Sequence, residues 1–543
     1  MIDSNPKIYG LKHDTWRSSQ FDFLNKATSI IENGGGFIFS ELPTGCGKTV
    51  IPTMLSTENK VLALVQTLGL LDQYEREYGF DIIKGKQEYP CMLQQKIRQW
   101  RLRYNKIPTV ADCHFDNPRQ CSVYGDCPYF QAKARAVASN RAACTYRYAA
   151  LSDHMQNRNG ILVLDEAHRS AEEMLALSEF IITQDNVDAY GLPNFPMDTF
   201  GPGGKGDILD IGTLGKILLW LLDCGLHVGR VDTLDLMTEE GARQKGFAKY
   251  IDRGIKMITH SDKDHPLFMY MGMRGDWENA SFCLILKPLS VVDVARSVFA
   301  NKQTVILMSA TIGNPDPLAT ELGIENYQSF TYPHPVPSEY RPVYDLEFER
   351  MTMANIKENP ALIRQQALSI ARFIKQFDPN WRGIVLTTAN YKIKEIREIL
   401  SERLPGRIFF PSRKAQYSVS RRINEFLEDR RQGLISIDTI QGWGSGLDLR
   451  NETARFSVVA GVPYMNPSEK FDVLRSERPG GYRYSMWNTF NHVVQACGRV
   501  SRGEITDDGN YLLNVSALAD GSCTIPQAMS LYPKWYKDAI VTP

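Results

Sequence analysis

Short apolar runs, each ended by Gly, Ser, Thr or Asp, recur along both halves of the chain. In the first half they cover residues 37–40, 61–65, 161–164 and 304–308, and in the second half 383–386, 434–437 and 456–460. Such runs are typical of strands that are buried on both faces of a parallel sheet. Helical patterns, for example over 391–400, lie between them. The sequence therefore predicts two α/β units.

The first α/β unit is interrupted twice. Residues 85–145 contain a group of cysteines, and residues 171–282 have a mixed, partly helical pattern. The first unit is then made of residues 1–84, 146–170 and 283–328, and the second unit covers 329–543. The longest apolar stretch, 208–226, contains Asp210, Lys216 and Asp223, so we expect core packing there rather than a membrane span.

The composition limits the partners. The 543 residues include 62 Lys and Arg and 62 Asp and Glu, so a polyanion would have to bind local basic patches rather than a general positive field. The start of the chain lacks the layout of a secretory signal, and no long uncharged apolar run is present. We expect a cytoplasmic protein without a membrane partner. Ten cysteines are too sparse for a disulfide framework.

A phosphate-binding loop is predicted after the run at 37–40. The segment PTGCGKT would aim backbone N–H groups at phosphates, Lys48 would add a positive charge, and Thr49 would ligate Mg²⁺. The expected ligands of ATP and Mg²⁺ in this loop are Thr44, Gly45, Cys46, Gly47, Lys48 and Thr49. Leu42 stands where the general pattern has its first glycine. Pro52 falls about one turn into the next helix and predicts that this helix is short or bent.

Two carboxylates end the run at 161–164. Asp165 can hold the Mg²⁺ shell, and Glu166 can polarise the attacking water. His168 is expected to link this site to a neighbouring motif.

The second unit carries three polar residues on one face of a predicted helix: Gln495, Arg499 and Arg502. Guanidinium groups in such a position can stabilise the charge of phosphoryl transfer across a domain cleft. The sequence thus predicts ATP hydrolysis between the two units.

Further segments carry a family resemblance. They are 16–20 (WRSSQ), Ser309-Ala-Thr311, and 439–449 with Gly446-Leu-Asp448. Together with the loop and the carboxylates, they resemble superfamily 2 helicases of the XPD/DinG type from Trp16 to about Gly503. The resemblance implies two RecA-like parallel-sheet domains, the first interrupted by an iron-sulfur insertion and by a mostly helical, arch-like insertion.

The same resemblance implies roles for several residues. Arg17 and Gln20 would bind the nucleotide, with Gln20 touching adenine. Ser309 and Thr311 would couple hydrolysis to movement, and Asp448 would lie at the cleft. Ser445 replaces the acidic residue that relatives often have before the glycine of this motif.

Four cysteines lie within the first insertion: Cys91, Cys113, Cys121 and Cys127. Four thiolates can hold a [4Fe-4S] cluster or zinc, although zinc sites usually show paired C-x-x-C knuckles, which are absent here. The absence of any metal is the third alternative. Cys144 could replace one ligand, and His114 is expected to be a bystander. The segments around Cys91 and Cys127 resemble the iron-sulfur segment of DinG-like helicases, which favours the cluster.

A basic and aromatic segment in the same insertion predicts a nucleic-acid surface. Cations can follow phosphates while aromatic rings stack on bases; the residues concerned are Lys96, Arg98, Trp100, Arg101, Arg103 and Tyr104. The alternative is a solvated basic helix whose aromatic rings pack on the cluster. Gln66 and Thr67 lie where superfamily 2 proteins grip a sugar-phosphate backbone.

The sequence-based hypothesis is an ATP-dependent DNA helicase that uses ATP, Mg²⁺ and a [4Fe-4S] cluster. Its partners would be single-stranded DNA and forked or tailed duplexes, and we expect a monomer. Movement from 5′ to 3′ is implied by the resemblance alone. The alternatives are an RNA helicase or translocase, and an ATP-gated clamp that binds DNA without unwinding it.

Overall fold

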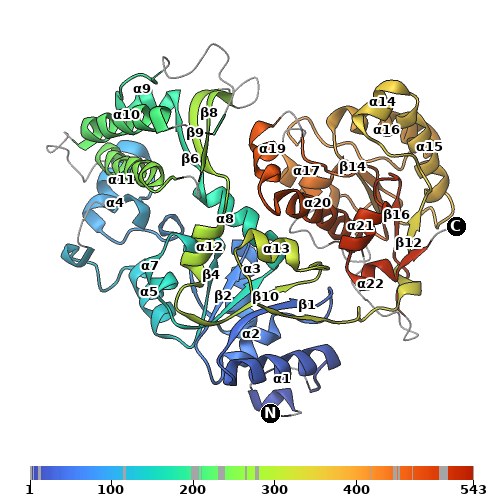
Figure 1. Cartoon of the computed structure of the whole chain (residues 1–543), viewed down its shortest axis with the longest axis horizontal. Helices are drawn as coiled ribbons and strands as arrows, with labels where there is room; N and C mark the ends of the chain where they lie inside the picture. Colours follow the sequence, from blue (N-terminus) through green and yellow to red (C-terminus); the bar gives the residue numbers. More distant parts are fainter. Residues whose placement is uncertain are drawn as a thin grey trace.

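The computed structural model describes residues 3, 5–9, 11, 14–113, 118–196, 207–208, 211–229, 239–262, 266–274, 281–415, 418–443, 449, 453–466, 469–500 and 511–541. It contains two α/β domains side by side and an insertion that projects from the first of them, at the upper left of Figure 1. Domain 1 is blue to yellow-green in that view, and domain 2 is yellow to red.

Domain 1 is built on a parallel sheet of seven strands in the order β11-β1-β10-β5-β2-β4-β3. The strands are β1 (Gly36–Glu41), β2 (Val61–Val65), β3 (Asp81–Ile83), β4 (Arg141–Thr145), β5 (Gly160–Asp165), β10 (Lys302–Ser309) and β11 (Gln328–Thr331). The four strands expected from the apolar runs are confirmed. The sequence pattern missed β3, β4 and β11. Since β4 pairs with β2, the sheet already resumes at Arg141.

Helices cover both faces of this sheet (Figure 1). They are α1 (Ser18–Glu32), α2 (Val50–Leu55), α3 (Leu68–Tyr78), α6 (Tyr146–Ala150), α7 (Asp153–Gln156), α8 (Ser170–Ser178), α12 (Val292–Phe299) and α13 (Asp316–Glu321). The six-residue α2 confirms the short helix predicted from Pro52.

Domain 2 has a parallel sheet of six strands in the order β14-β13-β15-β16-β12-β17. These are β12 (Val343–Asp345), β13 (Gly383–Thr387), β14 (Ile435–Thr439), β15 (Phe456–Val459), β16 (Val515–Leu518) and β17 (Ile540–Val541). Its helices are α14 (Met353–Glu358), α15 (Leu362–Ile374), α16 (Asn390–Arg403), α17 (Val419–Glu428), α18 (Ile440–Trp443), α19 (Lys470–Glu477), α20 (Gly481–Gly498), α21 (Pro526–Leu531) and α22 (Lys534–Lys537). The two RecA-like sheets predicted by the resemblance are therefore present.

The insertions differ in construction. The first contains α4 (Gln94–Tyr104) and α5 (Pro128–Ala138). The second contains α9 (Gln184–Tyr190), α10 (Ile211–Gly229) and α11 (Glu239–Thr259), with the strands β6 (Phe180–Thr183), β7 (Asp207–Ile208), β8 (Leu267–Arg274) and β9 (Ser281–Pro288). These strands form an antiparallel sheet, β6-β9-β8-β7, which the sequence analysis did not predict. None of the described helices is both long and apolar enough to cross a membrane.

One buried carboxyl at the end of β1 carries a prediction for stability. Glu41 is 2% exposed; its Oε2 accepts a hydrogen bond from the backbone N–H of Gly313 at 2.5 Å, and its Oε1 has no hydrogen-bond partner among the described residues. Burial raises the pKa of this carboxyl from 4.5 to about 8. The folded protein therefore keeps a proton on Glu41 over a pH range in which the unfolded chain has lost it.

Consequently, the part of the unfolding free energy that depends on Glu41 falls as the pH rises from about 4.5 through about 8. Glu41→Gln, which stays neutral, should raise the unfolding free energy at pH 8 by at most roughly 4 kcal/mol and have little effect at pH 4.5. Thermal melts at both pH values measure this difference. The exposed Glu58→Gln is the control, and equal effects of the two variants at pH 8 would contradict the prediction.

Candidate functional site

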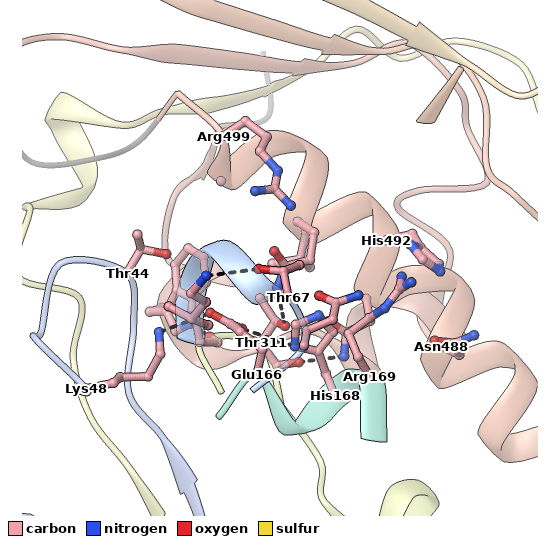
Figure 2. A pocket seen from close by; sticks show the side chains of 18 of the residues that line it. Thr44, Lys48, Thr67, Glu166, His168, Arg169, Thr311, Asn488, His492 and Arg499 are labelled. Atoms are coloured by element: carbon pink, nitrogen blue, oxygen red, sulfur yellow. Dashed lines mark hydrogen bonds and ion pairs between the residues drawn. The ribbon is translucent and has the colours of Figure 1, made fainter. Parts of the chain in front are cut away.

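A cleft of about 380 Å³ lies between the two domains. Domain 1 contributes residues that follow the carboxyl ends of β1, β2, β5 and β10, which meet at one edge of its sheet. Domain 2 contributes one side of α20. The cleft brings together nine of the residues predicted from the sequence: Thr44, Lys48, Gln66, Thr67, Glu166, His168, Thr311, Gln495 and Arg499. Figure 2 shows Lys48 and Arg499 at this cavity, each reaching it from a different domain.

The loop between β1 and α2 depends on two glycines. Gly45 and Gly47 have φ angles of 87° and 72°, in the left-handed region that favours glycine. A Cβ atom on Gly47 would lie 2.6 Å from Nε2 of Gln20. The Gln20 amide donates to the carbonyls of Cys46 (2.8 Å) and Gly47 (3.1 Å), so it holds the loop in place. Its contact with adenine stays a prediction, as does the nucleotide contact of Arg17.

Lys48 projects from this loop towards the end of β5. Its Nζ lies 3.6 Å from Oε1 of Glu166 and 3.5 Å from the carbonyl oxygen of Leu42. A phosphate group entering the cleft would offer the ammonium group a stronger partner than a neutral carbonyl. The binding of phosphate by Lys48 stays a prediction.

The two carboxylates at the end of β5 have contrasting environments. Asp165 accepts hydrogen bonds from the Tyr74 hydroxyl and the Glu166 backbone N–H, both at 3.0 Å. Burial, together with the charge of Glu166, raises the pKa of Asp165 to about 6. Burial also acts on Glu166, but Lys48 and His168 hold its pKa below the usual value. Glu166 therefore stays ionised, whereas burial and the neighbouring Glu166 charge oppose the ionisation of Asp165.

Glu166 has a φ of 52°, which is uncommon for a residue with a side chain. This backbone turn directs its carboxylate towards Lys48 and towards His168, whose Nδ1 lies 3.4 Å from Oε2. Strained backbone of this kind is concentrated at functional sites.

A chain of polar contacts leads from this site to domain 2. Nδ1 of His168 lies 2.8 Å from the Ser309 hydroxyl, which accepts from the backbone N–H of Thr311 at 3.2 Å. The Gln495 amide of α20 donates to the Thr311 hydroxyl at 2.8 Å. These hydrogen bonds thus connect three parts of the chain: His168, the segment that follows β10, and helix α20. Each of the three was singled out from a separate sequence motif.

Sequence reasoning missed several residues around the cleft. Trp535 of α22 donates from its indole N–H to the carbonyl of Ala310 at 2.9 Å, although the two residues are 225 positions apart. Asn491 donates to the carbonyl of Thr311 at 2.8 Å, and Tyr74 binds Asp165. No sequence motif marks these three residues, because each of their contacts depends on the packing of elements that are distant along the chain. Two predicted residues, Asp448 and Arg502, lie outside the described part of the chain.

The nucleic-acid surface predicted in the first insertion needs correction. Lys96 and Trp100 are buried, at 1% and 3% exposure; the Lys96 ammonium donates to the carbonyl of Asp112 and lies 5.1 Å from the Trp100 ring centre. The prediction that these two side chains contact nucleic acid is wrong in this structure, because their i, i+4 spacing places both on the inward face of α4. Arg98 and Arg101 are exposed. The structure does not describe the side chains of Arg103 and Tyr104.

Gln66 and Thr67, the other residues predicted to grip nucleic acid, lie at the wall of the cleft. The Gln66 amide donates to Glu173 at 3.1 Å, and the Thr67 hydroxyl accepts from the backbone N–H of Leu70 at 3.2 Å at the start of α3. Their backbone contacts with nucleic acid stay a prediction.

The four cysteines of the first insertion are half-buried and free of disulfides. Burial raises the pKa of Cys91, and the thiols of Cys113 and Cys121 add to this increase. Within the described residues, however, no three His, Cys, Asp or Glu side chains are close enough together to hold a metal ion. The side chains thus fit a shared cluster only in part.

The suggestion that Cys144 could replace one ligand is wrong. Cys144 lies in β4 with 0% exposure, inside the core of domain 1. Burial raises the pKa of its thiol to about 12, which disfavours the thiolate that a metal requires. His114, expected to be a bystander, lies outside the described residues.

Two family models match the sequence. Residues 13–190 match "Type III restriction enzyme, res subunit", and residues 374–524 match "Helicase C-terminal domain". The first match includes the phosphate loop and the carboxylates at the end of β5, and the second covers most of domain 2. No curated protein matches the sequence at a significant level.

Solved structures of XPD proteins share the fold. A structure described as "XPD_Helicase" is 14% identical over 97% of this chain and 100% of its own, with a TM-score of 0.59. The Xpd4 protein of S. tokodaii is 14% identical over the same shares of the two chains, with a TM-score of 0.57. A structure described as "XPD_APO" is 14% identical over 96% of this chain and 100% of its own, with a TM-score of 0.55. The chain thus combines a match to a helicase C-terminal domain and a match to a restriction-enzyme res subunit with the fold of the XPD structures, and in this it is similar to superfamily 2 helicases of the XPD/DinG type.

Proposed function

We propose that this helicase uses ATP to move along single-stranded DNA and to unwind forked or tailed duplexes. The observation that carries the proposal is the cleft, where Lys48 from domain 1 and Arg499 from domain 2 line one cavity. A triphosphate between them would join the two domains, and its hydrolysis would release them, which is how ATP can drive alternating closure.

Each side chain has a chemical role in this proposal. Lys48 and the loop from Thr44 to Thr49 bind the phosphates, while the Thr49 hydroxyl and Asp165 hold Mg²⁺. Glu166 orients and deprotonates the attacking water, and the guanidinium of Arg499 stabilises the charge of the transferring phosphoryl group. Ser309, Thr311 and Gln495 transmit the change to domain 2, with Asp448 and Arg502 as further cleft residues. The nucleotide itself would be recognised by Arg17 and Gln20.

Nucleic acid would bind mainly through its backbone. Gln66 and Thr67 at the cleft wall and the exposed Arg98 and Arg101 of α4 are the residues we assign to it. Such contacts position a strand without reading its sequence, and they weaken as the salt concentration rises. We therefore expect binding that tolerates any base order, by a protein that acts as a monomer.

Strand-displacement assays test the substrate and the direction. Duplexes with a single 5′ tail or a single 3′ tail, made of DNA or of RNA, are incubated with the protein and ATP-Mg²⁺. We expect displacement only from the 5′-tailed DNA duplex. Displacement of RNA duplexes would favour the RNA helicase, and ATP hydrolysis without displacement would favour the DNA clamp.

We further propose that Cys91, Cys113, Cys121 and Cys127 hold a [4Fe-4S] cluster that stabilises the first insertion. The support for this assignment is that all four cysteines lie in one insertion and that none of them is in a disulfide. Four thiolates are the usual ligand set of such a cluster, and a bound cluster would compensate for the small amount of apolar surface that the insertion can bury. The cluster is structural in this proposal, so no step of ATP hydrolysis passes through it.

Cys113→Ser should remove a ligand and with it the cluster. The anaerobically purified parent protein should be brown and contain about four iron atoms per chain, and the variant should lose most of both. Iron analysis and visible absorbance measure this, and zinc analysis of the same samples tests the rival metal. Cys224→Ala, at a buried cysteine of α10, is the control and should keep the iron. A Cys113→Ser protein with unchanged iron content would contradict the ligand set.

A further inference from the structure

Helix α20 is buried on two different faces. One face carries Phe490, Val493, Val494 and Cys497, which belong to the core of domain 2. The other face carries Tyr484, Trp487, Asn491 and Gln495, at spacings of three, four and four, and all four contact domain 1. A helix that belongs to domain 2 by sequence is therefore also a component of domain 1.

The contacts of the second face form a continuous row along domain 1. The Tyr484 hydroxyl donates to Glu172 at 3.0 Å, and the Trp487 indole N–H donates to the carbonyl of Ile312 at 2.7 Å. The next contacts, from Asn491 and Gln495, are made with Thr311. One helical turn beyond Gln495 stands Arg499, the residue that faces the cleft.

The start of this row is fixed by an interdomain ion cluster, which we define as Arg475, Arg478, Glu172 and Glu321. Arg475 of α19 donates to Glu172 of α8 at 3.0 Å and to Glu321 of α13 at 2.8 Å. Arg478 donates to the other oxygen of Glu321 at 3.0 Å. The Glu321 side chain is only 4% exposed and that of Arg475 11% exposed, so water screens these ion pairs weakly.

Apolar packing joins the same elements. Phe471 of α19 lies 5.3 Å from Phe268 of β8, measured between ring centres, in an edge-to-face arrangement. Phe471, Tyr484 and Trp487 belong to the same buried apolar cluster as the strands of domain 1. Opening this interface would expose these rings to water and would separate the buried ion pairs. A movement of domain 2 that opens the interface would therefore have a high free-energy cost.

From these contacts we infer that Arg475 is a positioning residue for ATP hydrolysis. The interdomain ion cluster fastens α19 and the start of α20 to domain 1, and this anchor stays closed throughout the ATP cycle. Domain 2, with α20 in its core, turns about the anchor, which thereby sets the positions that Gln495 and Arg499 take at the cleft. The inference rests on the proposed ATP-driven function. It assigns a role in ATP hydrolysis to a residue that lies outside the cleft and does not touch the nucleotide.

The first test separates positioning from stability. Arg475→Met keeps much of the side-chain length and removes both ion pairs. We expect kcat for ATP to fall by about 100-fold, because a small displacement of a catalytic group has an effect of that size, while KM for ATP changes little. Lys470→Met, at an exposed residue of the same helix, is the control and should keep its kcat.

Two further variants keep this test decisive if Arg475→Met folds poorly. Glu321→Gln combined with Arg475→Met avoids a buried carboxylate that has Arg478 as its one remaining ion-pair partner in the interdomain ion cluster, and Tyr484→Phe removes a single hydrogen bond to Glu172. Both should lower kcat with little change in KM. A lower melting temperature with unchanged kcat in these variants would show a merely structural role and overturn the inference.

The second test asks whether the anchor opens during turnover. Asp316 of α13 and Arg483 of α20 form an exposed ion pair of 3.5 Å across the interface. Asp316→Cys and Arg483→Cys in one protein can be bridged by a short bismaleimide, and each single variant treated in the same way is the control. We expect the bridged protein to hydrolyse ATP at the rate of the unbridged one. Loss of turnover on bridging would show that the interface must open.

The outcomes distinguish the two proposals. If the unaltered protein hydrolyses no ATP in the presence of single-stranded DNA, the proposed function itself is wrong. If the unaltered protein turns over normally and Arg475→Met does so as well, only the inference about the anchor is wrong.

Discussion

Lys48→Ala is expected to lower the rate of ATP hydrolysis by about 100- to 1,000-fold, while binding of single-stranded DNA stays largely intact. The ammonium group would be the phosphate-binding charge of domain 1, and none of the residues that we assign to nucleic acid contacts it in the structure. Its loss has a second effect. Lys48 is the charge that most strongly holds the pKa of Glu166 below its usual value, so removing Lys48 raises that pKa.

A steady-state ATPase assay with saturating single-stranded DNA measures the first effect, and a fluorescence-anisotropy titration without nucleotide measures DNA binding. The exposed Lys60→Ala is the matched control. Retained turnover in Lys48→Ala would contradict the assignment of the phosphate loop. A parallel loss of DNA binding would indicate that the loop supports the fold of domain 1 rather than the chemistry alone.

Arg499→Ala should lower kcat by about 1,000-fold with a smaller change in nucleotide affinity. Arg499 lies at the end of α20, is 7% exposed and lines the same cleft as Lys48. A guanidinium group that stabilises developing charge acts mainly in the transition state, so its removal affects kcat more than binding.

The affinity of a non-hydrolysable ATP analogue and the single-turnover rate separate these two quantities. Arg483→Ala changes an exposed arginine on the same helix and is the control. Equal losses of affinity and rate in Arg499→Ala would mean that this side chain supports the domain interface instead of the reaction.

Four strands inside the sheet of domain 1 could be predicted because parallel strands buried on both faces consist of nearly uninterrupted apolar runs. β1, β2, β5 and β10 all follow this pattern. The edge strands β11 and β17 escaped prediction for a physical reason. β11 is largely exposed and β17 has two residues, so neither needs a long apolar run.

The candidate site shows the same division. The segments from Thr44 to Thr49 and from Asp165 to His168 are continuous in sequence, and local chemistry predicted their residues. Tyr74 and Trp535 act through packing between elements that are distant along the chain, and no spacing rule predicts such contacts. Trp100 was assigned to the wrong environment because a basic helix face and an aromatic inner face occur in one segment, and the sequence does not show which face is turned inward.

The end of the chain has a practical consequence for work with this protein. The carbonyl of Trp535 accepts a hydrogen bond from Arg341 at 2.8 Å, its indole reaches Ala310, and β17 completes the edge of a sheet beside β12. Residues 534–541 thus support both the connection between the domains and the wall of the cleft. A variant without this segment would lose contacts that hold the cleft together although no motif had been removed.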